Sequence, residues 1–404
     1  MRPIHPFPAR MAPDLSRELL GALPPGSRVI DPMCGSGTVV RQAVEAGHSC
    51  VGRDVDPLAV LMTRAWTTPI PAYRLVHDAH EMVLRAQATN VAAVTLPWND
   101  DDTDAFARYW FAADQIDSLA RLCGALRACR YRTRDLLKIC FSRLIITKDS
   151  GASLARDVSH SRPHRVAMDS EFDVYAGFLR AARLVGSRLN PHDIRGHATV
   201  GLGDARKLDS GTDGQFDAAM TSPPYLNAID YLRGHRLTLI WFGHPVTELK
   251  QTRAASIGAE RATPEAPFDI APFITTQTED RLGERYQGWI RRYATDMTAT
   301  LAGLRLVVRP GGKIMLVVGN SLIRGAAVDN ARIIRQAAAH AGLSFVDACD
   351  RDIPARRRYL PTPSDGSALS LRMRTESVLT FRVPEHAARG ARHAPGDARE
   401  PAPR

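Results

Sequence analysis

A glycine-rich segment between a short apolar stretch and a helix narrows the fold of this chain more than any other feature. Residues 31–38 read Asp-Pro-Met-Cys-Gly-Ser-Gly-Thr, directly after the apolar pair Val29-Ile30. A helix is expected over 38–46, and a second strand is expected to start at residue 49 and to end at Asp54. This strand–helix–strand order is the βαβ unit of parallel sheets, so we predict a Rossmann-like α/β fold.

The composition of this loop indicates a ligand that approaches the backbone closely. Gly35 and Gly37 leave room beside the main chain, and the first N–H groups of the following helix are unpaired donors. The loop has neither the Gly-Lys-Ser/Thr of a P-loop nor the GxGxxG fingerprint of dinucleotide binding, which argues against a nicotinamide-dependent oxidoreductase. Asp31 would repel a pyrophosphate but attract a cation, and S-adenosylmethionine carries both an ammonium and a sulfonium group.

Two further acids follow strands in the order that such a ligand requires. Asp54 ends the second strand, and a carboxylate about 20 residues after the loop can accept both hydroxyls of a ribose. Asp56 is the neighbouring alternative for that role. Asp204 follows Gly203 after a short strand and can accept from the exocyclic amine of adenine. Each acid alone would more simply be a solvated turn residue, but together with Asp31 they predict one S-adenosylmethionine site.

A proline-rich turn follows a later strand. The strand expected over 216–220 leads into Thr221-Ser222-Pro223-Pro224-Tyr225. Two consecutive prolines restrict the backbone, fix their carbonyl groups and project the ring that follows. On its own this sequence predicts only a rigid turn with a packed tyrosine.

The glycine-rich loop and the Ser-Pro-Pro-Tyr turn, in this order, resemble the amino-group DNA methyltransferases, which methylate N4 of cytosine or N6 of adenine. Residues 5–10 (His-Pro-Phe-Pro-Ala-Arg) and 308–313 (Val-Arg-Pro-Gly-Gly-Lys) are also similar to segments of that family. The resemblance covers residues 1–60 and 196–320, with weaker matching to 382. It implies a Rossmann-like S-adenosylmethionine-dependent methyltransferase sheet, S-adenosylmethionine as cofactor and DNA as partner.

The resemblance also implies roles for individual residues. Ser222 Oγ and the Pro223 carbonyl would accept the hydrogens of the target amine and free its delocalised lone pair. Tyr225 would stack on a base flipped out of the duplex, and the methyl group would move in line to nitrogen with no covalent enzyme intermediate. The implied catalytic residues are Ser222, Pro223, Pro224 and Tyr225. The implied cofactor-binding residues are Phe7, Pro8, Asp31, Pro32, Cys34, Gly35, Ser36, Gly37, Thr38, Asp54, Asp204 and Ala205.

The target base and the substrate class have alternatives. A serine at the first position of the turn is similar to cytosine-N4 members, whereas adenine-N6 members more often carry Asp or Asn there. No Pro-Cys dipeptide occurs in the chain, which argues against methylation of cytosine C5. An RNA amine methyltransferase and a non-catalytic nucleic-acid-binding relative are further alternatives, and the intact motifs argue against the second. We expect a cytosine-N4 DNA methyltransferase, with adenine N6 as the alternative target.

The chain reads as one catalytic domain that carries an insertion. We expect the first half of the core over residues 1–60, a mainly helical insertion over 61–195, the second half of the core over 196–382 and a disordered tail over 383–404. Helical periodicity covers 58–65, 104–128, 134–146 and 171–189, and polar loops are expected over 148–165 and 251–280. Strands are expected over 198–201, 313–318 and 377–383, with a turn at 309–312.

Positive charge gathers in two stretches of the chain. The formal net charge is +10, and residues 121–165 alone hold 11 basic residues against three acids. Residues 351–374 hold six Arg against two Asp. Such clusters suit phosphate contacts, so we expect the insertion to contain the target-recognition region, with 251–280 as its rival. The candidate DNA-binding residues are Arg130, Arg132, Arg134, Lys148, Arg156, Arg162, Arg165, Arg356, Arg357 and Arg358.

Other features exclude whole classes of protein. Neither a run of about 18 apolar residues nor an apolar leader occurs, so neither a membrane span nor a signal peptide is expected. Six Cys lack CxxC spacing, which predicts free, mostly buried thiols, no zinc site and a reducing cytoplasm. A modification enzyme can act as a monomer, and a cognate restriction endonuclease is a candidate partner.

Overall fold

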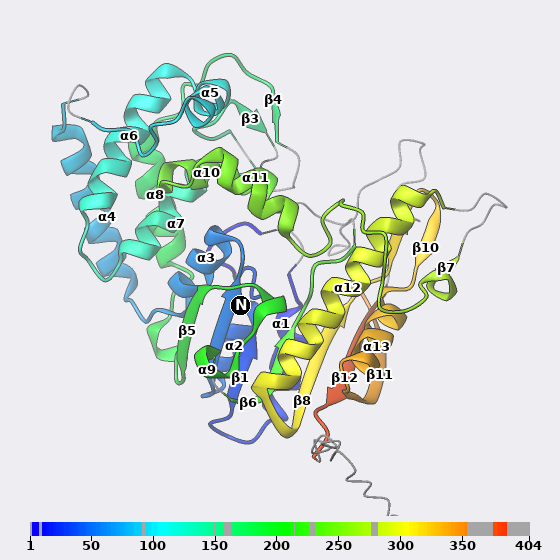
Figure 1. Ribbon diagram of the computed structural model, residues 1–404. Helices are drawn as coiled ribbons and strands as arrows, with labels where there is room; N and C mark the ends of the chain where they lie inside the picture. Colours follow the sequence, from blue (N-terminus) through cyan, green and yellow to red (C-terminus); the bar gives the residue numbers. More distant parts are fainter. Residues whose placement is uncertain are drawn as a thin grey trace, which may run out of the picture.

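The centre of the molecule is a seven-stranded sheet with the order β11-β12-β8-β6-β1-β2-β5 (Figure 1). The strands from β8 to β5 in this order run parallel, and β12 pairs antiparallel with both β8 and β11. The strands are β1 (Arg28–Asp31), β2 (Ser49–Asp54), β5 (His197–Leu202), β6 (Phe216–Thr221), β8 (Val308–Val318), β11 (Ser344–Asp352) and β12 (Thr375–Arg382). The computed structural model describes residues 2–7, 10–90, 94–148, 150–156, 158, 163–213, 215–226, 231–275, 282–353 and 375–385.

Helices cover both faces of this sheet, which confirms the expected Rossmann-like α/β fold. The helices are α1 (Pro13–Gly21), α2 (Thr38–Glu45), α3 (Pro57–Thr67), α4 (Ala72–Ala88), α5 (Asp101–Trp110), α6 (Ala113–Ala128), α7 (Arg134–Ile145), α8 (Val174–Gly186), α9 (Ser210–Asp213), α10 (Tyr231–Leu239), α11 (Val246–Ala255), α12 (Glu284–Val307) and α13 (Asn330–His340). Short 3₁₀ turns are η3 (Pro191–Asp193), η4 (Ala205–Lys207), η5 (Ile240–Phe242) and η6 (Ala271–Phe273). Two small sheets pair β3 (Ala155–Arg156) with β4 (His164–Arg165), and β10 (Ala326–Val328) with β7 (Ile274–Thr275) and β9 (Ser321–Ile323).

The glycine-rich loop forms as the sequence predicts. Val29 and Ile30 of β1 are fully buried, as the central strand of a parallel sheet requires. Helix α2 begins after Gly37, whose φ of 84° belongs to the left-handed region. A Cβ atom at this position would lie 2.7 Å from Thr63 Oγ1 and 2.9 Å from Thr63 Cα, so glycine is the residue that fits.

Each face of the sheet has its own apolar core. Ile314 and Met315, adjacent on β8, belong to different cores because successive side chains of a strand point to opposite faces. Ile314 packs in the core that includes Leu301 of α12, and Met315 packs in the core that includes Leu20 of α1 and Val40 of α2. The sheet therefore lies between two helical layers, and the loops of the candidate site leave it at the ends of the strands.

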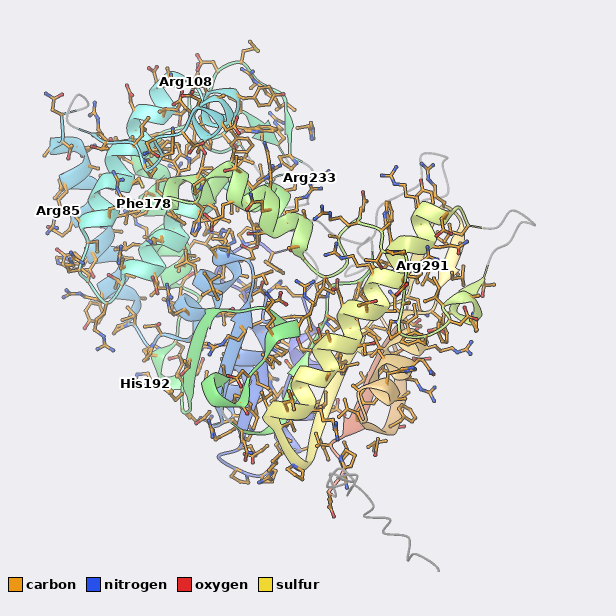
Figure 2. All side chains as sticks on the ribbon, viewed as in Figure 1. Arg85, Arg108, Phe178, His192, Arg233 and Arg291 are labelled. Carbon is orange, nitrogen blue, oxygen red and sulfur yellow. The ribbon has the colours of Figure 1, made fainter. Side chains whose placement is uncertain are left out.

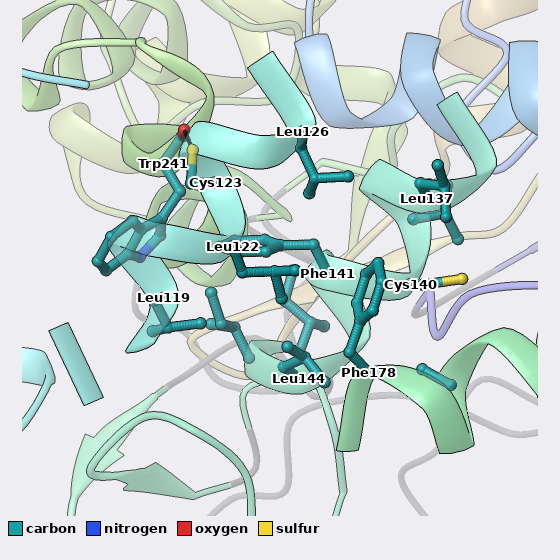
Figure 3. Close-up of a cluster of buried hydrophobic side chains, with 14 of the residues drawn as sticks. Leu119, Leu122, Cys123, Leu126, Leu137, Cys140, Phe141, Leu144, Phe178 and Trp241 are labelled. Atoms are coloured by element: carbon teal, nitrogen blue, oxygen red, sulfur yellow. Dashed lines mark hydrogen bonds between the residues drawn. The ribbon is translucent and has the colours of Figure 1, made fainter. Parts of the chain in front are cut away.

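A third core holds the helices that lie between β2 and β5 in the sequence. Figure 3 shows Leu122, Phe141 and Phe178 of three different helices packed together in it. Residues 231–255 also belong to this core, since Trp241 is buried there and Cys123 Sγ donates to its carbonyl oxygen at 2.8 Å. The helical unit thus contains α10, η5 and α11, although the sequence placed them with the second half of the sheet.

Several element boundaries differ from those expected. The helix expected over 104–128 is two helices, because the chain leaves α5 at the buried Phe111 and re-enters a helix at Ala113. The loop expected to be polar over 148–165 contains the buried Ala152 and Leu154. The turn expected at 309–312 lies within β8. The elements additional to those that the sequence pattern predicts are helices α1, α4 and α9–α13 and strands β3, β4, β7 and β9–β11. The loop expected over 251–280 begins inside α11 and contains η6 and β7.

The cysteines agree with the expectation of free, mostly buried thiols: all six are free, and only Cys349 is exposed. Within the described ranges no helix is long and apolar enough to cross a bilayer. The same ranges hold no group of three or more His, Cys, Asp or Glu side chains arranged to bind a metal ion.

Candidate cofactor and catalytic site

The two sequence motifs meet at one point of the sheet. Strands β2 and β5, which follow β1 in the sequence, lie on one side of β1 in the sheet, whereas β6 and β8 lie on its other side. The direction in which strands are added to the sheet therefore reverses between β1 and β6. In open α/β sheets, ligands bind outside the carboxyl ends of the strands at such a reversal. The loop over 31–38 leaves β1 and the turn over 222–225 leaves β6 at this edge, so the fold brings both predicted motifs to the same site.

Hydrogen bonds fix the loops against one another. Thr221 Oγ1 donates to Asp31 Oδ1 at 2.7 Å, which joins the end of β6 to the end of β1. Gly35 N donates to Asp54 Oδ2 at 2.8 Å, which joins the glycine-rich loop to the end of β2. Gly203 N donates to the Asp54 carbonyl at 3.0 Å, which adds the end of β5. The three predicted acids therefore border one continuous edge.

Two of these acids, the buried Asp31 and the half-buried Asp54, have raised pKa values. Burial raises the pKa of Asp31 to about 7, although hydrogen bonds from Thr221 and Met33 oppose the shift. Burial and the neighbouring Asp56 raise the pKa of Asp54 to about 6. No Arg or Lys among the described residues forms an ion pair with either carboxylate. A ligand that brings positive charge would relieve this strain.

The residues around these acids fit S-adenosylmethionine. Thr38 Oγ1, at the first residue of α2, is buried without a hydrogen-bond partner among the described residues, so a donor or acceptor is available at the helix N-terminus. The Phe7 ring lies against Gly35, 3.3 Å from where a Cβ would sit. Asp31 suits a cation and Asp54 suits ribose hydroxyls. Pro32 and Ser36 are buried in the same loop, whereas Pro8 lies outside the described residues.

The alternative acid for the ribose, Asp56, is occupied by the fold. It caps α3 by accepting from Leu58 N at 2.8 Å, and its other oxygen lies 2.5 Å from His235 Nδ1 of α10. Cys34 is likewise structural, because its Sγ accepts from Thr63 Oγ1 at 3.5 Å and burial raises the pKa of its thiol. These contacts favour Asp54 over Asp56 as the ribose acceptor and agree with Cys34 being a packing residue.

Asp204 differs from the open carboxylate that the sequence suggests. Arg206 Nε donates to Asp204 Oδ1 at 2.9 Å, and Arg206 Nη2 donates to Oδ2 at 2.6 Å. Burial raises the pKa of Asp204, but the hydrogen bonds from Arg206 outweigh it and the pKa falls below its ordinary value. Ala205, between the two, is buried. The Asp-x-Arg spacing was the sequence signal for this pair.

The catalytic turn is held by Ser222. Its Oγ donates to the Val317 carbonyl at 2.9 Å, and its side chain also hydrogen-bonds with Tyr225. Burial raises the pKa of Tyr225 well above its usual range, so its phenol stays protonated. Pro223 is buried and Pro224 half-buried. The stacking expected of Tyr225 stays a prediction, and its hydroxyl has a role that the sequence did not indicate.

An ion pair that sequence reasoning missed also lies at this edge. Arg351 and Glu376 face each other across β11 and β12, with Nε and Oε1 3.1 Å apart. Because β12 runs antiparallel to β8, it begins where β8 ends, beside the Ser222 acceptor Val317. The Glu376 carboxylate is close enough to raise the pKa of Tyr225, after burial itself. Nothing in the sequence around Glu376 indicates that it pairs with Arg351 beside the catalytic turn.

The candidate DNA-binding residues that the structure describes lie on several different elements. Arg130 and Arg132 are exposed beside Tyr131, whose hydroxyl accepts from Arg85 of α4 at 2.7 Å. Arg165, on β4, is half-buried with its guanidinium over the Tyr109 ring. Figure 2 shows Arg85 at the outer edge of the helical unit, far from Arg233 of α10. The remaining candidates divide into the exposed Lys148 and Arg156, the half-buried Arg134, and Arg162, Arg356, Arg357 and Arg358, which lie outside the described residues.

The polar stretch over 251–280, the other candidate for target recognition, lies against the catalytic turn. Gly258 has a φ of +77°, and a Cβ built there would lie 3.2 Å from the Tyr225 carbonyl oxygen and 3.8 Å from Pro224 Cβ. Thr263 N donates to the Gly288 carbonyl of α12 at 3.1 Å. Residues 256–263, which we call the strap, therefore run from the end of α11 past the catalytic turn to α12.

Comparisons with known proteins give one distant relative by sequence and solved structures of low similarity. No family model matches the chain. The type II methyltransferase M.MvaI of Kocuria varians is 22% identical over 428 residues, covering 94% of this chain and 90% of the relative. A TehB-like SAM-dependent methyltransferase from Corynebacterium glutamicum covers 91% of this chain and 86% of its own at 9% identity and a TM-score of 0.30. The rRNA methyltransferase aviRa from Streptomyces viridochromogenes covers 94% and 88% at 11% identity and a TM-score of 0.35.

The strand order, the paired motifs and the distant relative lead to one assignment. The seven-stranded mixed sheet is the Rossmann-like sheet of S-adenosylmethionine-dependent methyltransferases. S-adenosylmethionine is the cofactor that this relationship implies, and the acids at the carboxyl ends of β1 and β2 fit it. The chain is an S-adenosylmethionine-dependent methyltransferase with distant homology to the type II methyltransferase M.MvaI.

Proposed function

We propose that this chain is a DNA methyltransferase that moves a methyl group from S-adenosylmethionine to the exocyclic N4 amine of cytosine, flipped out of the duplex. The observation that carries the proposal is the hydrogen-bonding state of Ser222. Its Oγ donates to the Val317 carbonyl at 2.9 Å, so its proton is used and its remaining lone pair is available to accept. A hydroxyl held in this way accepts a hydrogen from an amine and does not donate to it.

Such an acceptor matters because the exocyclic amine of a base is a poor nucleophile, with its lone pair delocalised into the ring. Acceptors aimed at its two hydrogens draw the nitrogen toward tetrahedral geometry and free the lone pair for attack. Ser222 Oγ and the Pro223 carbonyl supply two acceptors whose positions are fixed before the substrate binds, because consecutive prolines restrict the backbone. The cofactor supplies an activated methyl group, and direct in-line transfer needs no nucleophile from the protein.

DNA is proposed as the substrate because the two motifs resemble those of amino-group DNA methyltransferases and because the relative is a type II methyltransferase. Cytosine is preferred to adenine because Ser222 stands first in the turn. We assign target recognition to the helical insertion over 61–195 together with the strap, and the close approach of Gly258 to the Tyr225 carbonyl supports including the strap. The protein would act in the cytoplasm, as a monomer or beside a cognate restriction endonuclease.

Labelled S-adenosylmethionine and duplex DNA test the proposal directly, with the DNA digested and the methylated nucleoside identified. We expect N4-methylcytosine. N6-methyladenine would move the assignment to the alternative base, and label found in RNA alone would contradict a DNA substrate. Cofactor binding without transfer to any nucleic acid would favour a non-catalytic relative.

Ser222→Ala tests the residue that carries the proposal. We expect turnover to fall by about 100-fold, in line with the loss of one preorganised hydrogen-bonding group, while cofactor affinity stays unchanged. Ser187→Ala is the matched control, because Ser187 Oγ also donates to a backbone carbonyl at 2.9 Å, at the end of α8. If the two variants turn over equally fast, Ser222 has no part in the transfer.

A further inference from the structure

Arg206 stands at the meeting point of three parts of the site. Its Nε and Nη2 donate to the two oxygens of Asp204 at 2.9 and 2.6 Å. Its Nη1 donates to Asp296 Oδ1 of α12 at 2.8 Å. Its Nη2 also donates to the carbonyl oxygen of Ala255 at 2.9 Å. A single planar guanidinium therefore holds a carboxylate of the cofactor edge, a helix of the sheet layer and the main chain of a third segment.

The Ala255 carbonyl is the contact that extends this network to the catalytic turn. Ala255 is the last residue of α11, and the strap begins with the next residue. The strap then passes Gly258, where a Cβ atom would lie 3.2 Å from the Tyr225 carbonyl oxygen. Arg206 thus lies between the acid at the end of β5 and the segment that touches the turn with the proposed amine acceptors.

The network is strongly held and is not a surface ion pair. Arg206 is 18% exposed, Asp204 20% and Asp296 10%. Hydrogen bonds to Asp204 raise the pKa of Arg206 above its already high value, so the guanidinium is always charged. Arg292 reaches Asp296 and the Ala255 carbonyl as well, but at 3.4 Å in both cases and without a contact to Asp204. Two cations and two anions balance, so loss of Arg206 would leave partly buried acids unpaired.

The paired hydrogen bonds from Arg206 Nε and Nη2, which we call the fork, still leave Asp204 an acceptor site for a ligand. Oδ1 accepts from Arg206 N at 3.0 Å and from Arg206 Nε at 2.9 Å, which uses both of its lone pairs. Oδ2 accepts from Arg206 Nη2 at 2.6 Å, and it shares the single Nε hydrogen with Oδ1 at 3.2 Å. Arg206 thus brings three hydrogens to a carboxylate with about four acceptor sites, so one site remains for an amine. The orientation of that site is set by the guanidinium.

We propose that Arg206 is a positioning residue of the methyl transfer: it aims Asp204 at the adenine amine of the cofactor and, through the Ala255 carbonyl, holds the strap against the Ser222–Tyr225 turn. Occupancy of the adenine end is thereby coupled to the order of the strap beside the target base. The cofactor half of this inference rests on the methyltransferase fold, and the target-base half rests on the proposed function.

The test compares wild type with Arg206→Met, using S-adenosylhomocysteine as the ligand so that no transfer occurs. Calorimetry measures its affinity, and hydrogen exchange of residues 256–263 measures the order of the strap. For wild type we expect slower exchange in the strap on binding. For Arg206→Met we expect about tenfold weaker binding and no slowing at saturation, a coupling of the size usual between linked sites. Arg292→Met, which leaves the Asp204 fork intact, should keep both properties within about twofold of wild type.

The outcomes separate this inference from the proposed function. Slowing of strap exchange by ligand in Arg206→Met, equal to that in wild type, would overturn the coupling, and so would a wild-type strap that ignores the ligand. Wild type that binds no S-adenosylhomocysteine would overturn the proposed function together with it. If Arg206→Met does not fold, Arg206→Lys keeps a charge between the two acids but cannot form the fork, and its strap should also fail to respond.

Discussion

Asp31 and Asp204 both follow strands of one sheet at the same edge, yet the chain treats their carboxylates in opposite ways. Asp31 is 3% exposed, has no basic partner among the described residues, and burial raises its pKa to about 7. Asp204 sits in the fork of Arg206, whose hydrogen bonds overcome the effect of burial and lower its pKa. One acid lacks a cation and the other has its cation built in.

This difference indicates what the ligand must supply at each end. A carboxylate buried without a countercharge costs free energy unless a cation arrives, so the end near Asp31 suits the ammonium or sulfonium end of S-adenosylmethionine. A carboxylate already neutralised by arginine needs only one more neutral donor, so the end near Asp204 suits the adenine amine. Asp54 lies between them, with two backbone N–H groups as partners, and suits the ribose.

The largest expected effect separates the two acids by cofactor affinity. Asp31→Asn should weaken S-adenosylmethionine binding by about 100-fold at pH 8, because it removes the buried charge that we expect to face the cationic end. Asp204→Asn should weaken binding by only about tenfold, because the amide still accepts through its oxygen. Calorimetry on both variants gives the ratio. Equal losses would mean that the cation does not lie at Asp31.

The parts of the site that the sequence predicts are those whose chemistry is local. Asp31, Asp54 and Ser222 each follow a strand directly, and a loop after a parallel strand must emerge at the carboxyl edge of the sheet. Their meeting follows from the topology alone. The requirement for glycine at position 37 is likewise visible in the motif, and the structure adds the reason, a close approach to Thr63.

The parts that the sequence did not predict depend on long-range register. Arg206 and Asp296 are 90 residues apart, and Arg351 meets Glu376 only because β11 and β12 pair in one particular register. Charge shows the same limit. The excess over 121–165 is real, but Arg143 points inward to the Ile4 carbonyl at 3.1 Å. Composition gives the net charge of a stretch, but it does not show which of its side chains reach the surface.

The second prediction uses folding stability, where the two acids should act in opposite directions. Asp31→Asn should stabilise the ligand-free protein at pH 8 by on the order of 2 kcal/mol, because it removes a charge whose burial is not compensated, while the amide still accepts from Thr221. Asp204→Asn should destabilise it by about 1 kcal/mol, because it weakens the pair with Arg206. Urea unfolding of both variants measures the two signs. Destabilisation by Asp31→Asn would show that its charge has a partner in the protein.

The smallest expected effect is the pH dependence of ligand binding. The pKa values of about 7 for Asp31 and about 6 for Asp54 lie above the ordinary value of 3.8, so the ligand-free protein keeps protons that the unfolded chain releases. Its stability therefore falls as pH rises from about 4 to about 7 and levels off above that. The ammonium group of the ligand favours an ionised Asp31, and the ribose hydroxyls favour an ionised Asp54 as acceptor. The affinity for S-adenosylhomocysteine should therefore rise about tenfold between pH 6 and pH 8. Asp31→Asn corrects for titration of the ligand itself, and in this variant only the weaker dependence from Asp54 should remain. An unchanged slope in Asp31→Asn would contradict the assignment of this proton to Asp31.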